Sequence, residues 1–153
     1  MSENQLLLYT VPDKALDDFL RVQRIDRDVK YAMESISVDT IKHDDWGPYM
    51  ETYTSILDDH DVDLNESGSN EAAETLTGLE DHSLYVWFTF SSREAKKVAK
   101  KMRAVTITEE DAENYFEVDE TTLPDLQGIH AAFLLALEEV EDGQTLVMPI
   151  AAS

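Results

Sequence analysis

The oxygen-rich segment 59–65 has the residue spacing that comes closest to a metal site. Asp59, Asp61, Asp63 and Asn65 place oxygen ligands at every second position, as a calcium-binding loop does. An EF-hand loop also requires glycine at its sixth position and glutamate at its twelfth. A loop that begins at Asp59 or Asp61 has neither residue. We therefore expect a solvated acidic loop here, with no specific metal or cofactor site.

The four histidines are the other candidates for chemistry, because imidazole titrates near neutral pH. His43, His60 and His82 each stand beside an aspartate in the sequence, which would raise the pKa of the imidazole if the two groups met in space. His130 lies next to the apolar stripe of a predicted helix. We expect it at the edge of the core and not as a catalytic base.

Glycine and cysteine usage excludes several large enzyme classes. No two of the five glycines lie within nine residues of one another, whereas phosphate-binding loops need closely spaced glycines. The absence of cysteine excludes thiolate metal sites, disulfides and cysteine nucleophiles. We therefore expect no enzymatic activity. A cysteine-free chain, without a signal-peptide pattern at 1–10 or an apolar run approaching the roughly 20 residues of a membrane span, favours a cytoplasmic protein.

Charge is the strongest signal in the sequence. Twelve Lys and Arg residues against 33 Asp and Glu give a formal net charge of -21. The stretches 43–92 and 104–153 contain twelve carboxylates each and no Lys or Arg. Between them, the predicted helix 93–103 carries a basic stripe, which consists of Lys96, Lys97, Lys100 and Lys101. The chain is therefore acidic in two blocks that flank one basic helix.

Strand patterns predict a single α+β domain over residues 1–153. The clearest strand, 83–90, is apolar on both faces, which is typical of a central strand that is covered on both sides. Tyr85 and Trp87 share one face of it, where we expect sheet core in preference to a ligand pocket. Pro149 indicates an edge strand, because proline donates no ladder hydrogen bond. Further strands are predicted at 5–9, 105–107 and 145–150, and uneven connections favour a mixed sheet packed against several helices.

Helix starts are marked by capping signals. Ser91 with Glu94, and Thr108 with Asp111, have the spacing of capping boxes. The first box precedes helix 93–103, whose buried stripe is predicted to be Ala95, Val98, Ala99 and Met102. The second precedes a helix through Tyr115 and Phe116, and a longer helix is predicted from Pro124 to Gly143.

The first half of the chain has weaker helix signals. Thr10 and Pro12 predict a helix start, and a second helix is expected to begin near Trp46, within 44–48. The polar segment 58–80 is predicted to be a long loop with at most one short helix near 71–75.

The layout of these elements resembles a known family. The predicted order is a strand, a helix opened by Ser91-Ser92-Arg93-Glu94, a helix opened by Ile107-Thr108-Glu109-Glu110, then Phe133-Leu134-Leu135-Ala136-Leu137 and a final strand after Gly143. This order, with the opening 6–20 and the tryptophan at Trp46, is similar to the uncharacterised YfbM-like family of bacterial proteins. The resemblance implies a fold, since that family has no established activity.

The charge layout leads to three functional hypotheses. Repulsion within the acidic blocks costs stability, so either function or a saline solvent must favour the charge. The first hypothesis is an interaction protein that binds a basic partner, such as an inhibitor that places carboxylates where DNA phosphates would lie, as phage and mobile-element anti-defence proteins do. The alternatives are an acidic housekeeping or small-ligand-binding domain, and adaptation to high salt. Direct binding to nucleic acid or membrane is not expected, because phosphates would be repelled.

The first hypothesis assigns residues to a partner-binding face. These are Asp58, Asp59, Asp61, Asp63, Glu109, Glu110, Asp111, Glu113, Glu117, Asp119 and Glu120. For the basic stripe we expect a contact within the chain or between subunits of a homo-oligomer, the alternative being that the lysines only solvate their helix.

Overall fold

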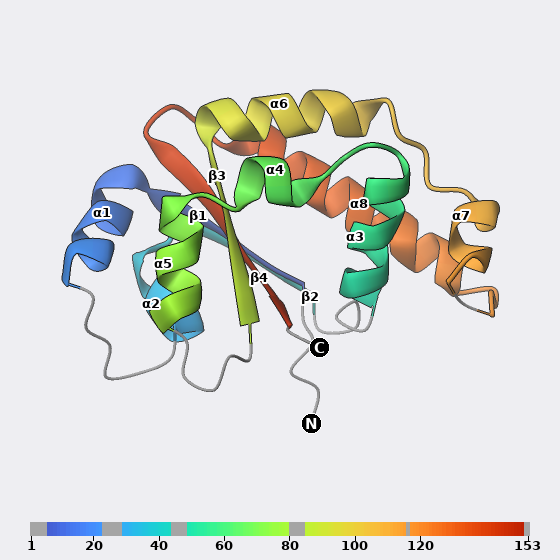
Figure 1. Cartoon of the computed structure of the whole chain (residues 1–153), viewed down its shortest axis with the longest axis horizontal. Coiled ribbons are helices and arrows are strands. Elements are labelled where there is room, and N and C mark those ends of the chain that lie inside the picture. The colour runs from blue at the N-terminus through green and yellow to red at the C-terminus, as the bar shows by residue number, and fades with distance from the viewer. Residues whose placement is uncertain (1–5, 23–28, 44–48, 80–84, 116, 152–153) are drawn as a thin grey trace.

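The part of the chain that the structure describes folds around one four-stranded antiparallel sheet (Figure 1). The computed structural model describes residues 6–22, 29–43, 49–79, 85–115 and 117–151. The strands are β1 (Leu6–Pro12), β2 (Asp39–His43), β3 (Tyr85–Ser91) and β4 (Gln144–Ala151), in the order β2-β1-β4-β3. The predicted α+β class is confirmed.

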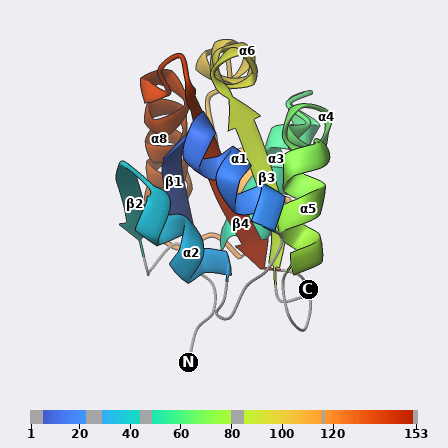
Figure 2. The same ribbon diagram turned by 90° about the vertical axis from the view of Figure 1, so that its left-hand side faces the viewer.

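Helices cover both faces of the sheet (Figure 2). On one face lie α1 (Asp13–Val22), α2 (Val29–Ile36) and α5 (Glu71–Leu79), and on the other lie α3 (Met50–Asp59), α6 (Ser92–Arg103) and α8 (Thr122–Glu139), with α4 (Leu64–Gly68) beside β3 and α7 (Glu109–Glu113) against α8. Successive residues of β3 enter opposite cores. Trp87 packs with Tyr9 in the smaller core, and Phe90 packs with Phe133 in the larger one.

The position of β3 corrects the prediction of a central strand at 83–90 in a mixed sheet. Within the described strands β3 lies at the edge, and all pairings are antiparallel. Its outer edge is closed by side chains: the Trp87 N–H donates to Thr77 Oγ1 over 3.0 Å, and Asn70 Nδ2 donates to the Thr89 carbonyl over 2.9 Å. The apolar residues on both faces of β3 therefore reflect the helices that cover both faces of the sheet. They do not show whether the strand is central or at the edge.

Pro149 lies in β4, an inner strand, so the prediction of an edge strand is wrong. Pro149 stands opposite Trp87, whose N–H points outward to Thr77. The pair is thus a non-hydrogen-bonded pair of the antiparallel ladder, which requires no N–H from proline. On its other side, β4 pairs with β1 only over 144–147. Proline is tolerated because neither neighbouring described strand needs its missing donor.

Both predicted capping boxes are confirmed. The Ser91 and Thr108 hydroxyls accept hydrogen bonds from the backbone N–H groups three residues later, at Glu94 and Asp111. The carboxylates of Glu94 and Asp111 in turn accept from the backbone N–H groups of Ser91 and Thr108. The stripe of α6 is buried as predicted. The second helix, α7, ends at Glu113, short of the prediction, whose last residue Phe116 lies outside the described residues.

Two predicted boundaries in the C-terminal half are wrong. The segment 105–107 is not a strand, because the Ile107 carbonyl accepts a hydrogen bond from Gln127 Nε2 of α8 in place of a ladder partner. Helix α8 ends at Glu139 and not at Gly143, whose φ of 86° belongs to the turn before β4.

The N-terminal predictions also need correction. Thr10 is not a helix cap, since it pairs with Asp39 and Leu146 inside the sheet, and β1 continues through Pro12. Helix α1 begins at Asp13, whose carboxylate accepts from the Thr145 hydroxyl at 2.6 Å. The helix start predicted at 44–48, with Trp46, and the first residues of the strand predicted at 83–90 lie outside the described residues.

The polar segment 58–80 contains two helices. The short helix expected near 71–75 is present as α5, but it continues to Leu79, and α4 occupies part of the predicted loop. Asp63 caps α4 by accepting from the Asn65 N–H, and Asn70 Oδ1 accepts from the Ala73 N–H in the first turn of α5. A few buried apolar side chains hold both helices, among them Leu64 and Leu76. Because so few apolar residues are buried, the sequence of these helices shows little of the helical hydrophobic periodicity by which a helix is predicted.

Substitution of two helical glycines tests how closely α4 packs on β3. A Cβ at Gly68 would lie 2.8 Å from Phe90 Cζ and 3.1 Å from Phe88 Cδ1, so Gly68→Ala should lower the free energy of unfolding by about 1–3 kcal/mol. A Cβ at the exposed Gly78 of α5 meets no described heavy atom within 4 Å, and Gly78→Ala should raise stability by about 0.5–1 kcal/mol through helix propensity. Urea unfolding measures both, and effects of the same sign would contradict the packing.

Candidate functional site

The two acidic blocks meet where the C-terminal end of α3 lies beside α7. His60 Nε2 lies 3.0 Å from Asp111 Oδ1, and the Tyr115 hydroxyl donates to Asp59 Oδ2 over 2.6 Å. These bonds join segments that are far apart in the sequence. The carboxylate within hydrogen-bonding distance of His60 is thus Asp111, which is 51 residues away in the sequence.

The turn after α3 has a defined cause. Helix α3 ends in a Schellman motif, in which the Val62 N–H donates to the Leu57 carbonyl at 2.9 Å and the Asp61 N–H donates to the Asp58 carbonyl at 3.0 Å. Asp61 adopts the left-handed conformation that this motif needs, with φ of 64°. Val62 and Leu57 are both buried in the larger core. The motif therefore turns the acidic segment outward while its apolar residues stay anchored.

Eight of the predicted residues form what we call the acidic face. Four follow one another through the end of α3 to the start of α4, and four lie on α7: Asp58, Asp59, Asp61, Asp63, Glu109, Glu110, Asp111 and Glu113. All are exposed except Asp111, which is half-buried. The other three predicted residues, Glu117, Asp119 and Glu120, are exposed in the segment that joins α7 to α8.

Some of these carboxylates have structural roles. Asp63 caps α4, and Asp119 accepts hydrogen bonds from Thr121 and Thr122, which lower its pKa. Burial alone would raise the pKa of Asp111, but hydrogen bonds from Thr108 and His60 outweigh it and hold the pKa below its ordinary value. On the acidic face, the carboxylates without such a role among the described contacts are Asp58, Asp61, Glu109, Glu110 and Glu113.

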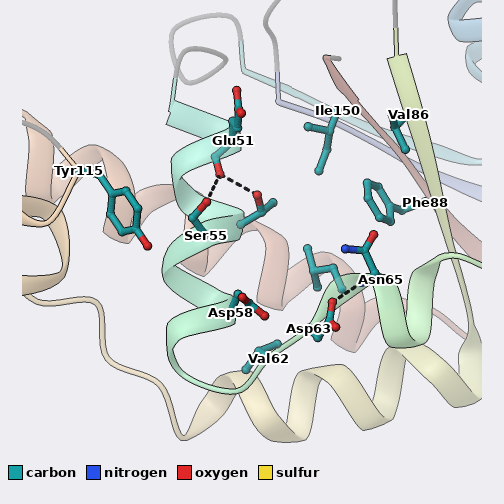
Figure 3. Close-up of a pocket in the computed structure, with 12 residues that line it drawn as sticks. Glu51, Ser55, Asp58, Val62, Asp63, Asn65, Val86, Phe88, Tyr115 and Ile150 are labelled. Atoms are coloured by element: carbon teal, nitrogen blue, oxygen red, sulfur yellow. Dashed lines mark hydrogen bonds between the residues drawn. The ribbon is translucent and has the colours of Figure 1, made fainter. Parts of the chain in front are cut away.

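A groove of about 760 Å³ adjoins the acidic face, between α3 and the sheet (Figure 3). Carboxylates of Glu51, Asp58 and Asp63 line one side. Val86 and Phe88 of β3 and Ile150 of β4 line the other. We call this cavity the acidic groove. Sequence reasoning missed it, because nothing in an unbroken apolar strand shows that the Val86 side chain would be left 40% exposed.

His130 is a buried structural residue. Its Nε2 lies 3.1 Å from the Met102 carbonyl, which can only accept, so Nε2 carries the proton and Nδ1 accepts from the Tyr53 hydroxyl at 2.9 Å. Burial lowers the pKa of His130 and raises that of Tyr53 well above its usual value. Both ring nitrogens are engaged, so the imidazole has no lone pair available to a substrate. Tyr85 and Trp87 likewise lie in sheet core, as expected.

The basic stripe lies on α6, and one of its lysines contacts the turn that follows α8. Lys96 Nζ lies 3.6 Å from Asp142 Oδ1, and Arg103 Nε, on the same helix, lies 3.1 Å from Glu138 Oε2. The first pair is exposed to 67% and 92%, so it contributes little stability. A larger contact through Lys97, Lys100 and Lys101 stays a prediction.

Metal-ligand clusters and membrane-spanning helices are both absent from the described residues, 6–22, 29–43, 49–79, 85–115 and 117–151. Within these ranges no three His, Asp or Glu side chains converge so that they could hold a metal ion. No helix in the same ranges is long and apolar enough to cross a membrane. The chemistry that the acidic groove and face offer is the binding of cations.

No protein-family model, curated protein or solved structure matches this chain. The resemblance to the YfbM-like family therefore stays a prediction.

The Tyr53–His130 bond can be tested by deletion of one hydroxyl. Tyr53→Phe leaves Nδ1 of a buried imidazole without its donor, which should lower the free energy of unfolding by about 1–3 kcal/mol. Tyr115→Phe is the matched control, since it removes an exposed hydroxyl, and its effect should be smaller. Urea denaturation measures both, and equal losses would contradict a buried network.

The His60–Asp111 contact should make stability depend on pH. Because the pKa of Asp111 lies below its ordinary 3.8 in the folded chain, the stabilisation is present above pH 3.8 and is lost as the pH falls through the folded-state pKa. Asp111→Ala, which also breaks a capping box, should cost about 1 kcal/mol at pH 7 and less at pH 3. Glu113→Ala is the matched control, since it removes the same charge from α7 but leaves the His60 contact and the capping box in place. Thermal unfolding measures both variants, and a loss of stability for Asp111→Ala that is equal at pH 7 and pH 3 would contradict the assignment.

Proposed function

We propose that this chain is a non-enzymatic interaction protein whose acidic face binds a basic partner protein. The observation that supports it is the meeting of the two acidic blocks through the His60–Asp111 and Tyr115–Asp59 contacts. Solubility requires only that the carboxylates be exposed. It does not require hydrogen bonds that hold two negatively charged segments side by side. Binding of a cationic partner would be favoured, because its positive charges reduce the repulsion between these carboxylates.

The construction of the acidic face favours fast recognition. Its exposed carboxylates stand on helix ends and on a Schellman turn, so their positions are set before a partner arrives. Complementary charge accelerates association and makes it sensitive to salt, because the screening length is about 8 Å at physiological ionic strength. We therefore expect rapid, salt-sensitive binding.

The finer proposal is that the partner binds nucleic acid and that this chain inhibits it. Rows of carboxylates on a rigid surface can occupy cationic sites that otherwise hold DNA phosphates. A cytoplasmic place of action belongs to the same proposal. The alternatives, housekeeping acidity and adaptation to high salt, require no discrete partner.

Neutralisation of the acidic face tests the proposal. The variant combines Asp58→Asn, Asp61→Asn, Glu109→Gln, Glu110→Gln and Glu113→Gln, which spares the carboxylates that have structural roles. The control neutralises the same number of exposed carboxylates elsewhere, with Asp17→Asn, Asp39→Asn, Glu34→Gln, Glu74→Gln and Glu139→Gln.

Both variants and the wild type are used to capture proteins from host lysate at about 0.05 M and about 0.5 M NaCl. A basic partner should be retained at low salt by the wild type and the control, and should bind the acidic-face variant at least about tenfold more weakly. Duplex DNA should displace that partner if the chain mimics nucleic acid. A lysate without a salt-sensitive partner, or a partner that binds all three proteins equally, would refute the proposed function.

A further inference from the structure

The acidic groove combines two kinds of surface that a simple acidic patch lacks. Its sheet side is apolar, with Val86 and Ile150 directly paired across β3 and β4 and Phe88 next along the strand. Its helix side carries Glu51 and Asp58, one at each end of α3. The volume of about 760 Å³ exceeds what a bare metal ion or a single water needs.

The polar groups on the α3 side present acceptors to the groove. The hydroxyls of Thr54 and Ser55 donate their protons to the Glu51 carbonyl, over 2.7 Å and 3.2 Å (Figure 3). Their oxygens can then only accept from an occupant. The carboxylates of Glu51, Asp58 and Asp63 are acceptors as well. An occupant must therefore supply donors on this side and apolar surface on the other.

We infer that the acidic groove receives an arginine side chain, flanked by apolar residues, from the basic partner. A guanidinium group supplies five N–H donors in a planar fork that suits carboxylates, and its aliphatic stem can lie along Val86 and Ile150. This inference rests on the proposed function, because the groove shares Asp58 and Asp63 with the acidic face. A segment bound to the face can thus continue into the groove.

The charge balance argues for a separate partner over a second copy of this chain. A second copy could offer its basic stripe, but it would also bring a formal charge of -21 against an equal charge. A polyamine would satisfy the carboxylates of the groove but has no apolar branches for Val86 and Phe88. Both occupants are distinguished from an arginine-bearing segment in the test.

The test uses labelled hexapeptides and fluorescence anisotropy at physiological ionic strength. One peptide alternates leucine and arginine, and the other alternates serine and arginine with the same charge. Two groove variants separate the contributions: Val86→Ser removes apolar surface, and Glu51→Gln removes a charge. Their matched controls are Val38→Ser and Glu74→Gln, at exposed positions outside the groove.

We expect the leucine–arginine peptide to bind the wild type at least about tenfold more tightly than the serine–arginine peptide. Val86→Ser should remove most of that preference, Glu51→Gln should weaken both peptides severalfold, and the controls should change neither. Methyl signals of Val86 and Ile150 should shift on binding in NMR spectra. Equal binding of the two peptides, preferential binding of spermine, or self-association that Val86→Ser abolishes would overturn the inference.

Failure of the groove and failure of the proposed function give different results. If a salt-sensitive partner is captured and Glu51→Gln and Val86→Ser leave its affinity unchanged, the groove inference is wrong and the function stands. If the peptides behave as expected but the lysate yields no such partner, the groove chemistry stands and the proposed function is wrong.

Discussion

The buried hydrogen-bond chain from Tyr53 through His130 to the Met102 carbonyl fixes the helices on which the rest of the structure depends. It ties α3 to α8 and to the C-terminal end of α6 inside an otherwise apolar core. Water cannot replace these partners there, so a displaced α3 would leave polar atoms unsatisfied. Tyr53 faces inward while Glu51 and Asp58 of the same helix face solvent. The position of the acidic groove therefore follows from a polar contact in the core.

Alternating burial explains how an acidic surface can stay ordered despite its repulsion. Along the segment that follows α3, Asp61 and Asp63 are exposed while Val62 and Leu64 are buried. The residue after each carboxylate is apolar and buried in the larger core, and its burial fixes the backbone that carries the carboxylate. The every-second-residue spacing that suggests a calcium loop in the sequence coincides with this alternation of exposed and buried side chains.

The sequence correctly predicted those features that depend only on residues close to one another in the chain. The capping boxes at Ser91 and Thr108 and the buried stripe of α6 depend on residues within one or two turns, and all were predictable. The edge position of β3 was not, because the hydrogen bonds that cap its outer edge come from Asn70 and Thr77, which lie at least ten residues away in the sequence. The acidic residues could be named from the sequence as well. Their meeting, and the groove beside it, required the tertiary contacts of His60.

The order of strands has a consequence for how the chain acquires its structure. Strand β4 lies between β1 and β3 but follows both of them in the chain. Until residues 144–151 have been synthesised, β1 and β3 cannot be joined, and the apolar surfaces that they will share stay uncovered. Pairings between such distant segments slow folding, because a large loop must close before any contact forms. Before β4 is in place, the strong negative charge opposes association between neighbouring chains, because like charges repel.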